Sequence, residues 1–243
     1  MKLAIISGGS QGLGAALCDR YARAGFQLLE FSRHAPHPFS IGCDFSQPQA
    51  LSVCLSKAFA PYREATLDEL VVISNAATLD PIAPNGALDS ESIQRNLNIN
   101  LVGAIIFMNA ALRAFGGHAA RKTLVSISSG AAHKGYAGWS LYCASKAGLE
   151  NYLRAVAAEQ QREAQPFATL SIDPGVMDTG MQALIRQTST EQFPARERFV
   201  GLQQDGQLRP PGDIAAAIVE LVARSHAPAS CLKAAEALPG PPG

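Results

Sequence analysis

Ser7-Gly8-Gly9-Ser10-Gln11-Gly12-Leu13-Gly14 links a short apolar run, residues 3–6, to a stretch of helical periodicity, residues 12–24, that ends at Gly25. This order predicts a strand, a glycine-rich turn and a helix. In such a turn the backbone amides and the positive end of the helix dipole can hold a pyrophosphate, and glycine allows close approach. The spacing is G-x-x-x-G-x-G, not the commoner G-x-G-x-x-G, so a purely structural turn is the alternative. Its position directly after the first strand favours a dinucleotide site.

The alternation of strands and helices continues along the rest of the chain. We expect strands at 27–32, 39–43, 70–74, 123–128, 169–173 and 230–233, and helices at 47–59, 90–115, 140–162 and 211–223. Six or seven strands alternating with helices indicate an α/β fold, a single-domain, Rossmann-type, doubly wound parallel sheet over residues 1–236. Residues 177–210 interrupt the alternation and are expected to form a small substrate lid. The Pro/Gly-rich residues 237–243 are expected to be a flexible tail.

Length and composition exclude several classes of protein. The 243 residues are 47% hydrophobic and 16% charged, too apolar for a disordered chain. The 20 basic and 20 acidic residues give a net charge of zero, which argues against a nucleic-acid groove or a polybasic membrane patch. The apolar runs at 3–6 and 101–108 are too short for a signal peptide core and a membrane span. We therefore expect no nucleic-acid or membrane partner.

The five cysteines are odd in number, widely spaced and without a C-x-x-C pair. This pattern predicts neither a disulfide framework nor a zinc site. We expect reduced thiols in a cytoplasmic protein, and no metal.

Tyr142 and Lys146 lie four residues apart near the start of an expected helix, so the phenol and the ammonium share one face. A Tyr and Lys at this spacing are usually a solvated pair. Ser129, however, follows an expected strand and so lies at the carboxyl edge of the sheet, where open α/β sheets bind ligands. Reduction of a carbonyl needs a proton donor, a second hydrogen bond to the oxygen, and a cation that makes the phenol more acidic. The three residues together favour that chemistry.

With these motifs in order, residues 1 to about 225 resemble the short-chain dehydrogenase/reductase family. The likeness rests on the glycine turn, on Ser129, and on the segments Asn75-Ala76-Ala77, Asn100-Leu101-Val102-Gly103, Tyr142-x-x-x-Lys146 and Pro174-Gly175 with Thr179. The resemblance implies a catalytic tetrad. Tyr142 would donate the proton, Ser129 would hold the substrate oxygen, Lys146 would bind the nicotinamide ribose and lower the pKa of the tyrosine, and Asn100 would anchor a water relay.

The resemblance also implies a cofactor site at the carboxyl edge of the sheet. Its expected members are Gly8, Ser10, Gln11, Gly12, Leu13, Gly14, Arg33, Asp44, Phe45, Asn75, Ala76, Ala77, Tyr142, Lys146, Pro174, Gly175, Val176 and Thr179. Two departures stand out. Ala77 replaces the usual Gly beside the cofactor, and the C-terminal region lacks the D-G-G of many members, which puts the usual tetramer contact in doubt.

The end of the second strand reads Phe31-Ser32-Arg33. In this family an Asp at that end selects NAD through the adenosine ribose. Here the carboxylate is missing and a guanidinium follows, able to fork onto a 2′-phosphate, so the expected cofactor is NADP, used as NADPH. A surface arginine with no ligand is the alternative. Glu30 comes two residues too early and is expected to point elsewhere.

Three stretches, 127–142, 174–182 and 193–211, are similar to the benzil reductase and sepiapterin reductase-like branch. The expected pocket is apolar and partly aromatic: Tyr136, Trp139, Val176, Met177, Met181, Leu184 and Ile185. Such a pocket suits a bulky carbonyl substrate, an α-diketone such as benzil or a related aromatic or pterin carbonyl, although each member taken alone is more often core than pocket. The enzyme alternative is a 3-oxoacyl-thioester reductase, and a non-catalytic dinucleotide sensor is an alternative of another class. Apolar stripes at 90–115 and 140–162 resemble the family's dimer interface, so a homodimer is expected, although both stripes could face the sheet.

Overall fold

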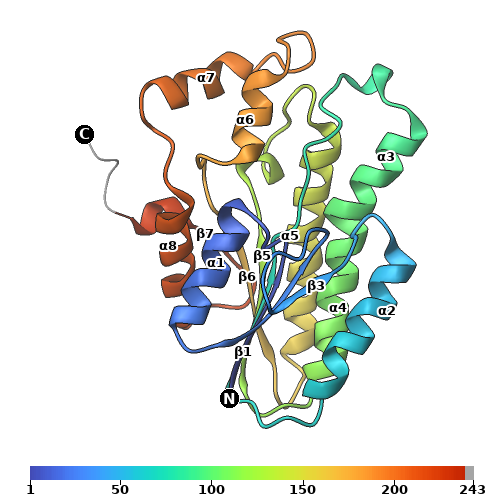
Figure 1. Cartoon of the computed structure of the whole chain (residues 1–243), viewed down its shortest axis with the longest axis vertical. Coiled ribbons are helices and arrows are strands. Elements are labelled where there is room, and N and C mark those ends of the chain that lie inside the picture. The colour runs from blue at the N-terminus through green and yellow to red at the C-terminus, as the bar shows by residue number, and fades with distance from the viewer. Residues whose placement is uncertain (239–243) are drawn as a thin grey trace.

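A parallel sheet of seven strands, in the order β3-β2-β1-β4-β5-β6-β7, runs through the computed structural model, which describes residues 1–238 (Figure 1). The strands are β1(Lys2–Ser7), β2(Gln27–Ser32), β3(Ser40–Gly42), β4(Glu69–Ser74), β5(Arg121–Ile127), β6(Phe167–Asp173) and β7(Ser230–Lys233). Every neighbouring pair is parallel. The predicted single-domain, doubly wound sheet is confirmed.

Helices cover both faces of the sheet. They are α1(Gly12–Arg23), α2(Pro48–Phe59), α3(Ser90–Leu97), α4(Gly103–Phe115), α5(Ser140–Gln160), α6(Gly180–Gln187), α7(Arg196–Gln204) and α8(Pro211–Ala223). Short 3₁₀ turns lie at η1(Ala60–Tyr62), η2(Asn85–Ala87), η4(Gly130–Ala132) and η5(Ala234–Ala237). α1 and α8 pack on one face, and α2, α4 and α5 on the other (Figure 1).

The central strands are apolar on both sides because both faces are covered. Leu3, Ile5 and Leu70 belong to the core under α2, α4 and α5, while Ala4 and Ile6 belong to the core under α1 and α8. This is why β1 reads as a continuous apolar run and not as an alternating one.

The helix expected at 90–115 is interrupted, which corrects the sequence prediction. A turn of π-helix, η3(Asn98–Val102), separates α3 from α4. The side chain of Asn98 donates to Ser46 O at 3.2 Å, and a Cβ on Gly103 would lie 2.9 Å from Phe45 O. By length and apolar composition 90–115 could cross a membrane. In this structure α4 instead buries Phe107 and Phe115 in the core.

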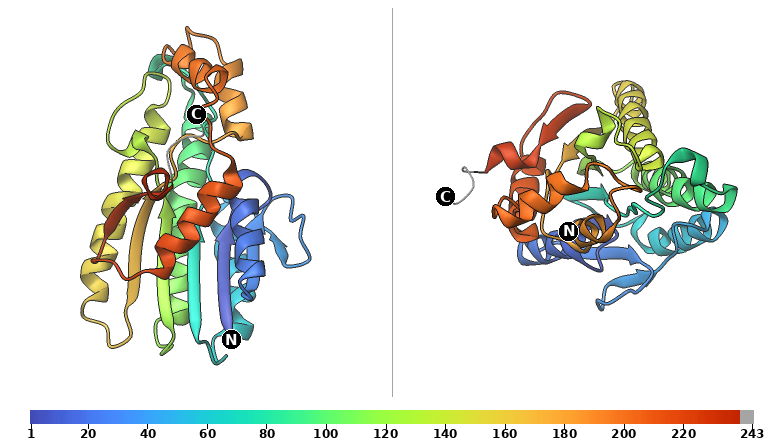
Figure 2. Two further views of the ribbon diagram at one scale, coloured as in Figure 1. Left: turned by 90° about the vertical axis from the view of Figure 1, so that its left-hand side faces the viewer. Right: turned by 90° about the horizontal axis from the view of Figure 1, so that it is seen from above.

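Residues 177–210 carry α6 and α7, which stand above the carboxyl edge of the sheet (Figure 2).

The C-terminal tail was expected to begin at residue 237, and the first two residues of that range belong to the described structure. Ala237 closes η5, and Leu238 packs against the core under α8. The remainder of the expected tail lies outside the described residues.

Candidate active site

A cleft of about 700 Å³ opens at the carboxyl edge of the sheet. It lies where the strand order reverses, since the chain proceeds outward from β1 through β2 to β3 and then from β4 to β7 on the other side. Ligands bind at such a switch point in open α/β sheets. Each of the eighteen residues expected to hold a cofactor lines this cleft, as does Ser129.

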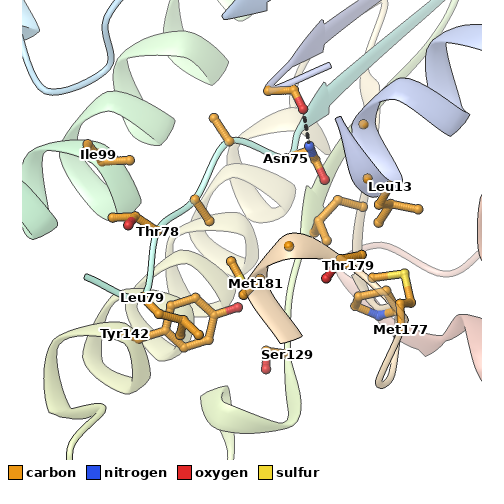
Figure 3. A pocket seen from close by; sticks show the side chains of 18 of the residues that line it. Leu13, Asn75, Thr78, Leu79, Ile99, Ser129, Tyr142, Met177, Thr179 and Met181 are labelled. Carbon is orange, nitrogen blue, oxygen red and sulfur yellow. Dashed lines mark hydrogen bonds between the residues drawn. The ribbon is translucent and has the colours of Figure 1, made fainter. Parts of the chain in front are cut away.

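The glycine loop forms the floor of one half of the cleft. Gly8 has a φ of +71°, and a Cβ on Gly14 would lie 2.0 Å from Gly8 O. The side-chain amide of Asn75, the residue that follows β4, donates to Ser7 O at 3.2 Å and to Gly8 O at 2.9 Å, and so fixes the loop to the end of that strand (Figure 3). Side chains larger than that of glycine would not fit at Gly8 and Gly14, and the backbone of both residues lines the cleft.

The first turn of α1 fits an anionic group. Gln11 precedes the helix with no side-chain cap, and the first turn contains no acidic residue. The unpaired N–H groups at such a terminus, together with the helix dipole, attract phosphate. The loop and the terminus therefore suit the pyrophosphate of a dinucleotide.

Arg33 and His34 line the cleft at the end of β2, together with Asp44 and Phe45 after β3. Arg33 is exposed, and within residues 1–238 no protein group binds its guanidinium. Ser32 takes the place of a selecting carboxylate, and its hydroxyl donates to Glu30. This end of the cleft is open to an additional phosphate.

Tyr142 projects from the first turn of α5 into the other half of the cleft, where Figure 3 shows it near Ser129 and Leu79. The side chain is 7% exposed. The pKa of Tyr142 is raised to about 12, mainly by burial; the nearby hydroxyl of Ser129 acts to lower it and the charge of Asp173 acts to raise it. The phenol is thus protonated across the neutral range.

Lys146 lies one turn further along α5 with its Nζ 5.5 Å from the centre of the Tyr142 ring. The ammonium donates to Ile127 O at 2.6 Å. Burial lowers the pKa of Lys146 to about 8, and the negative charge of Asp173 opposes this shift. The direction expected for the Tyr142 pKa was downward, through Lys146. Here it is upward, because burial outweighs the other influences.

Asn100 is 1% exposed and sits under the cleft, within η3, and does not line it. Its Oδ1 accepts from Thr78 N at 2.8 Å, and its Nδ2 donates to Thr78 O at 2.8 Å and to Asn96 Oδ1 at 2.9 Å. Both amide protons are therefore used. In this structure the side chain holds the segment after β4, and its amide protons are not free for the expected water relay.

Aromatic side chains close the end of the cleft beyond Tyr142. The ring of Trp139 stacks on Phe193 at 4.3 Å, lies edge-on to Tyr142 at 6.0 Å, and contacts Phe199 from α7. Met181 packs against the same aromatic cluster, whereas Met177 packs against the core under α8 and lies beside Thr179 in Figure 3. Of the expected pocket residues only Leu184 does not line the cleft, and it is 41% exposed.

Sequence reasoning missed the roles of three residues in or beneath the cleft. Phe193 and Phe199 were not assigned to the pocket, although both lie in the stretch 193–211. Glu30 does not line the cleft, as expected, but its position beneath the glycine loop, where it accepts from Gly9 N, was not foreseen. Among residues 1–238, no group of three or more His, Cys, Asp or Glu side chains could hold a metal ion.

Comparisons with known proteins agree with this geometry. The family described as short chain dehydrogenase matches residues 2–190. A benzil reductase ((S)-benzoin forming) of Bacillus subtilis is 34% identical over 91% of this chain and 93% of its own length. A sepiapterin reductase of Mus musculus is 29% identical over 84% of this chain and 85% of its own. The crystal structure of the KRED1-Pglu enzyme superposes with a TM-score of 0.81 at 26% identity, covering 95% of this chain and 100% of that one.

Proposed function

The chain belongs to the short-chain dehydrogenase family of oxidoreductases, and on this premise we propose that it is an NADPH-dependent carbonyl reductase whose substrates are α-diketones or related aromatic carbonyls. One observation carries the proposal. Tyr142, Ser129 and Lys146 share a cleft with an uncapped helix terminus and a glycine loop, so a proton donor and a dinucleotide cradle open into the same space.

NADPH, when bound, supplies a hydride to the carbonyl carbon. Tyr142 gives its phenolic proton to the carbonyl oxygen, and the hydroxyl of Ser129 donates a hydrogen bond to the same oxygen. The product is a secondary alcohol, and a proton from solvent restores the phenol. Because burial raises the pKa of Tyr142 to about 12, the phenol remains protonated at neutral pH and can act as the proton donor.

Lys146 supports both the phenol and the cofactor. Its ammonium has three protons, and Ile127 O takes one of them at 2.6 Å. The other protons are available to the hydroxyl groups of the nicotinamide ribose. The positive charge near Tyr142 also favours the phenolate that forms when the proton leaves.

Arg33 supports NADP over NAD. A guanidinium beside Ser32, in place of a carboxylate, can bind a 2′-phosphate with two parallel hydrogen bonds and does not repel it. Nothing in residues 1–238 competes for that guanidinium. The exposed position of Arg33 on the rim of the cleft is consistent with this role.

The substrate class rests on the aromatic wall and on the relatives. Trp139, Tyr136 and Phe199 line the end of the cleft that faces Tyr142, with Met181 and Ile185 beside them. Flat rings pack well on such a surface. The benzil reductases among the relatives act, by their names, on a diketone with two rings.

The remaining features of the proposal concern the surroundings of the site. We assign residues 177–210 as a substrate lid, because α6 and α7 bring Met181, Ile185 and Phe199 over the cleft. We also propose a cytoplasmic homodimer. The five cysteines are unpaired, and the apolar residues Leu101, Ile105 and Leu112 are only half-buried on their own chain.

The test is to follow NADPH oxidation by absorbance with benzil, a smaller α-diketone, a pterin carbonyl, a steroid ketone and a 3-oxoacyl thioester. We expect the diketones to give the highest kcat/KM and chiral chromatography to identify an α-hydroxyketone product. A higher kcat/KM for the 3-oxoacyl thioester would refute the substrate assignment. Absence of NADPH oxidation with every compound would refute the activity itself.

A further inference from the structure

Glu30 is a buried carboxylate that forms no salt bridge with any of residues 1–238. It lies in β2, is 0% exposed, and is covered by the glycine loop. Oε1 accepts from Gly9 N at 2.8 Å, while Oε2 accepts from Ser32 Oγ at 3.1 Å and from Ser40 Oγ at 2.5 Å. A buried charge is tolerated when several donors converge on it, and here the three donors come from three different segments.

Two of these donors, Ser32 and Ser40, flank the loop 33–40, which carries Arg33. Ala35 in this loop has a φ of +41°, a left-handed conformation that alanine rarely adopts. Its N–H donates to Ser32 Oγ at 3.2 Å, the same hydroxyl that donates to Glu30. An unfavourable backbone conformation persists only where the surroundings fix it, so this contact helps to set the path of the loop.

The far end of the loop returns to the same carboxylate. The N–H of His37 donates to Ser40 Oγ at 3.1 Å, and that hydroxyl donates to Glu30. The imidazole Nε2 of His37 lies 3.2 Å from Gly9 O, within hydrogen-bond distance. Both ends of the loop are therefore tied, through one serine each, to Glu30 and to the glycine loop.

The fit between Gly9 and Glu30 is tight. A Cβ on Gly9 would lie 2.4 Å from Glu30 Cγ and 2.7 Å from Cys18 Sγ, so no larger residue can occupy this position without displacing them. The glycine loop thus rests on the carboxylate at contact distance. A change at Glu30 must alter the position of the loop, of Arg33, or of both.

We propose that Glu30 is a positioning residue for cofactor selection, which holds the glycine loop and the loop 33–40 at one fixed separation. That separation spaces the pyrophosphate site at the start of α1 from the guanidinium of Arg33. The inference rests on the proposed function in one respect, the assignment of Arg33 to a 2′-phosphate. Glu30 does not line the cleft, so its effect on the nucleotide would act through the two loops.

A different effect of Glu30 would have the opposite sign. A negative charge beneath a phosphate site repels the cofactor, and it repels a nucleotide with an additional phosphate more strongly. If repulsion dominated, removal of the charge would increase the preference for the 2′-phosphorylated nucleotide. If positioning dominates, that preference falls.

The experiment measures the dissociation constants of 2′,5′-ADP and 5′-AMP by calorimetry for the full chain and for Glu30→Gln. Ser40→Ala removes one of the three hydrogen bonds and leaves the charge in place. Glu69→Gln is the matched control, because Glu69 pairs with Lys2 and Arg121 and does not line the cleft. Thermal melting checks the fold of each variant, and kcat at saturating NADPH reports on the catalytic half of the site.

We expect Glu30→Gln to reduce the preference for 2′,5′-ADP by about tenfold or more, the scale of one charge-assisted hydrogen bond, and Ser40→Ala to reduce it about threefold. Glu69→Gln should bind both nucleotides with the dissociation constants of the parent. In each variant kcat at saturating NADPH should be unchanged. Should Glu30→Gln fail to fold, Ser40→Ala and Ser32→Ala decide the matter.

Equal weakening of both nucleotides, an unchanged ratio, or a ratio that rises in Glu30→Gln would overturn the inference alone. A parent protein that binds both nucleotides equally would overturn the assignment of Arg33, and with it this inference. The two failures are thereby separated.

Discussion

Replacement of Tyr142 by Phe should separate catalysis from stability. The ring keeps its edge-on contact with Trp139 at 6.0 Å, and the substitution removes at most one hydrogen bond, to the nearby Ser129. Loss of one hydrogen bond costs a net ~0.5–1.5 kcal/mol. For a chain of this size each kcal/mol moves Tm by about 2–4 °C, so Tm should fall by no more than about 6 °C.

Turnover should fall much further. General acid catalysis contributes ~10²–10⁴ in rate, which corresponds to about 2.7–5.4 kcal/mol of transition-state stabilisation. The assay is NADPH-dependent reduction of benzil, with NADPH affinity measured separately by fluorescence. Since the ammonium of Lys146 and the glycine loop are untouched, NADPH affinity should remain within about twofold of the parent.

Tyr152→Phe provides the matched control, because Tyr152 lies on the same helix, is half-buried, and does not line the cleft. It should retain full turnover. The assignment of Tyr142 as the acid is refuted if Tyr142→Phe reduces benzil within about threefold of the parent rate. It is equally refuted if weaker NADPH binding accounts for the whole loss.

The other predictions address the cofactor site, the lysine and the assembly. Arg33→Asp should reverse the preference for NADPH over NADH, a change of about ten- to a hundredfold in each direction measured as kcat/KM for the two cofactors. Gly14→Ala should abolish nucleotide binding by calorimetry, because the new Cβ would lie 2.0 Å from a backbone oxygen that cannot move independently. Activity should decline as the pH rises through about 8, where Lys146 loses its proton, and Lys146→Arg, if it folds, should move that decline to higher pH in a pH–rate profile. Light scattering at micromolar concentration should give the mass of a dimer, and a monomer mass would contradict the interface assigned to α4 and α5.

Much of the fold could be predicted because its signals are local. The turn at 7–14 follows a strand that is apolar on both faces, and the strands at 27–32 and 230–233 have the bounds that the structure gives them. The break at Asn98–Val102 could not be predicted in the same way. Residues 90–115 have a continuous helical stripe, whereas the bonds that Asn98 and Asn100 make at the π-turn go to segments distant in the sequence, which the sheet brings beside them.

The same distinction separates the candidate site from its supports. Tyr142, Lys146 and Ser129 are recognisable because the chemistry dictates their types and their spacing. Glu30 has no such signature, since its partners Gly9 and Ser40 lie 21 and 10 residues away in the sequence. A carboxylate in an apolar strand signals only that donors must converge on it, and tertiary structure determines which donors those are.

The segment after β4 connects the two halves of the cleft and is fixed by hydrogen bonds at both of its ends. Its first residue, Asn75, donates through its side chain to Ser7 O and Gly8 O, which fixes the segment to the glycine loop. Three residues on, Thr78 has both its N–H and its carbonyl bound by the amide of Asn100, as a neighbouring strand would bind them. A backbone segment at a sheet edge lacks such a neighbour and would otherwise need water for these groups. Two asparagines, each bonded to backbone, therefore join the dinucleotide half of the cleft to the half that contains Tyr142. The segment that joins them, from Asn75 to Thr78, is only four residues long.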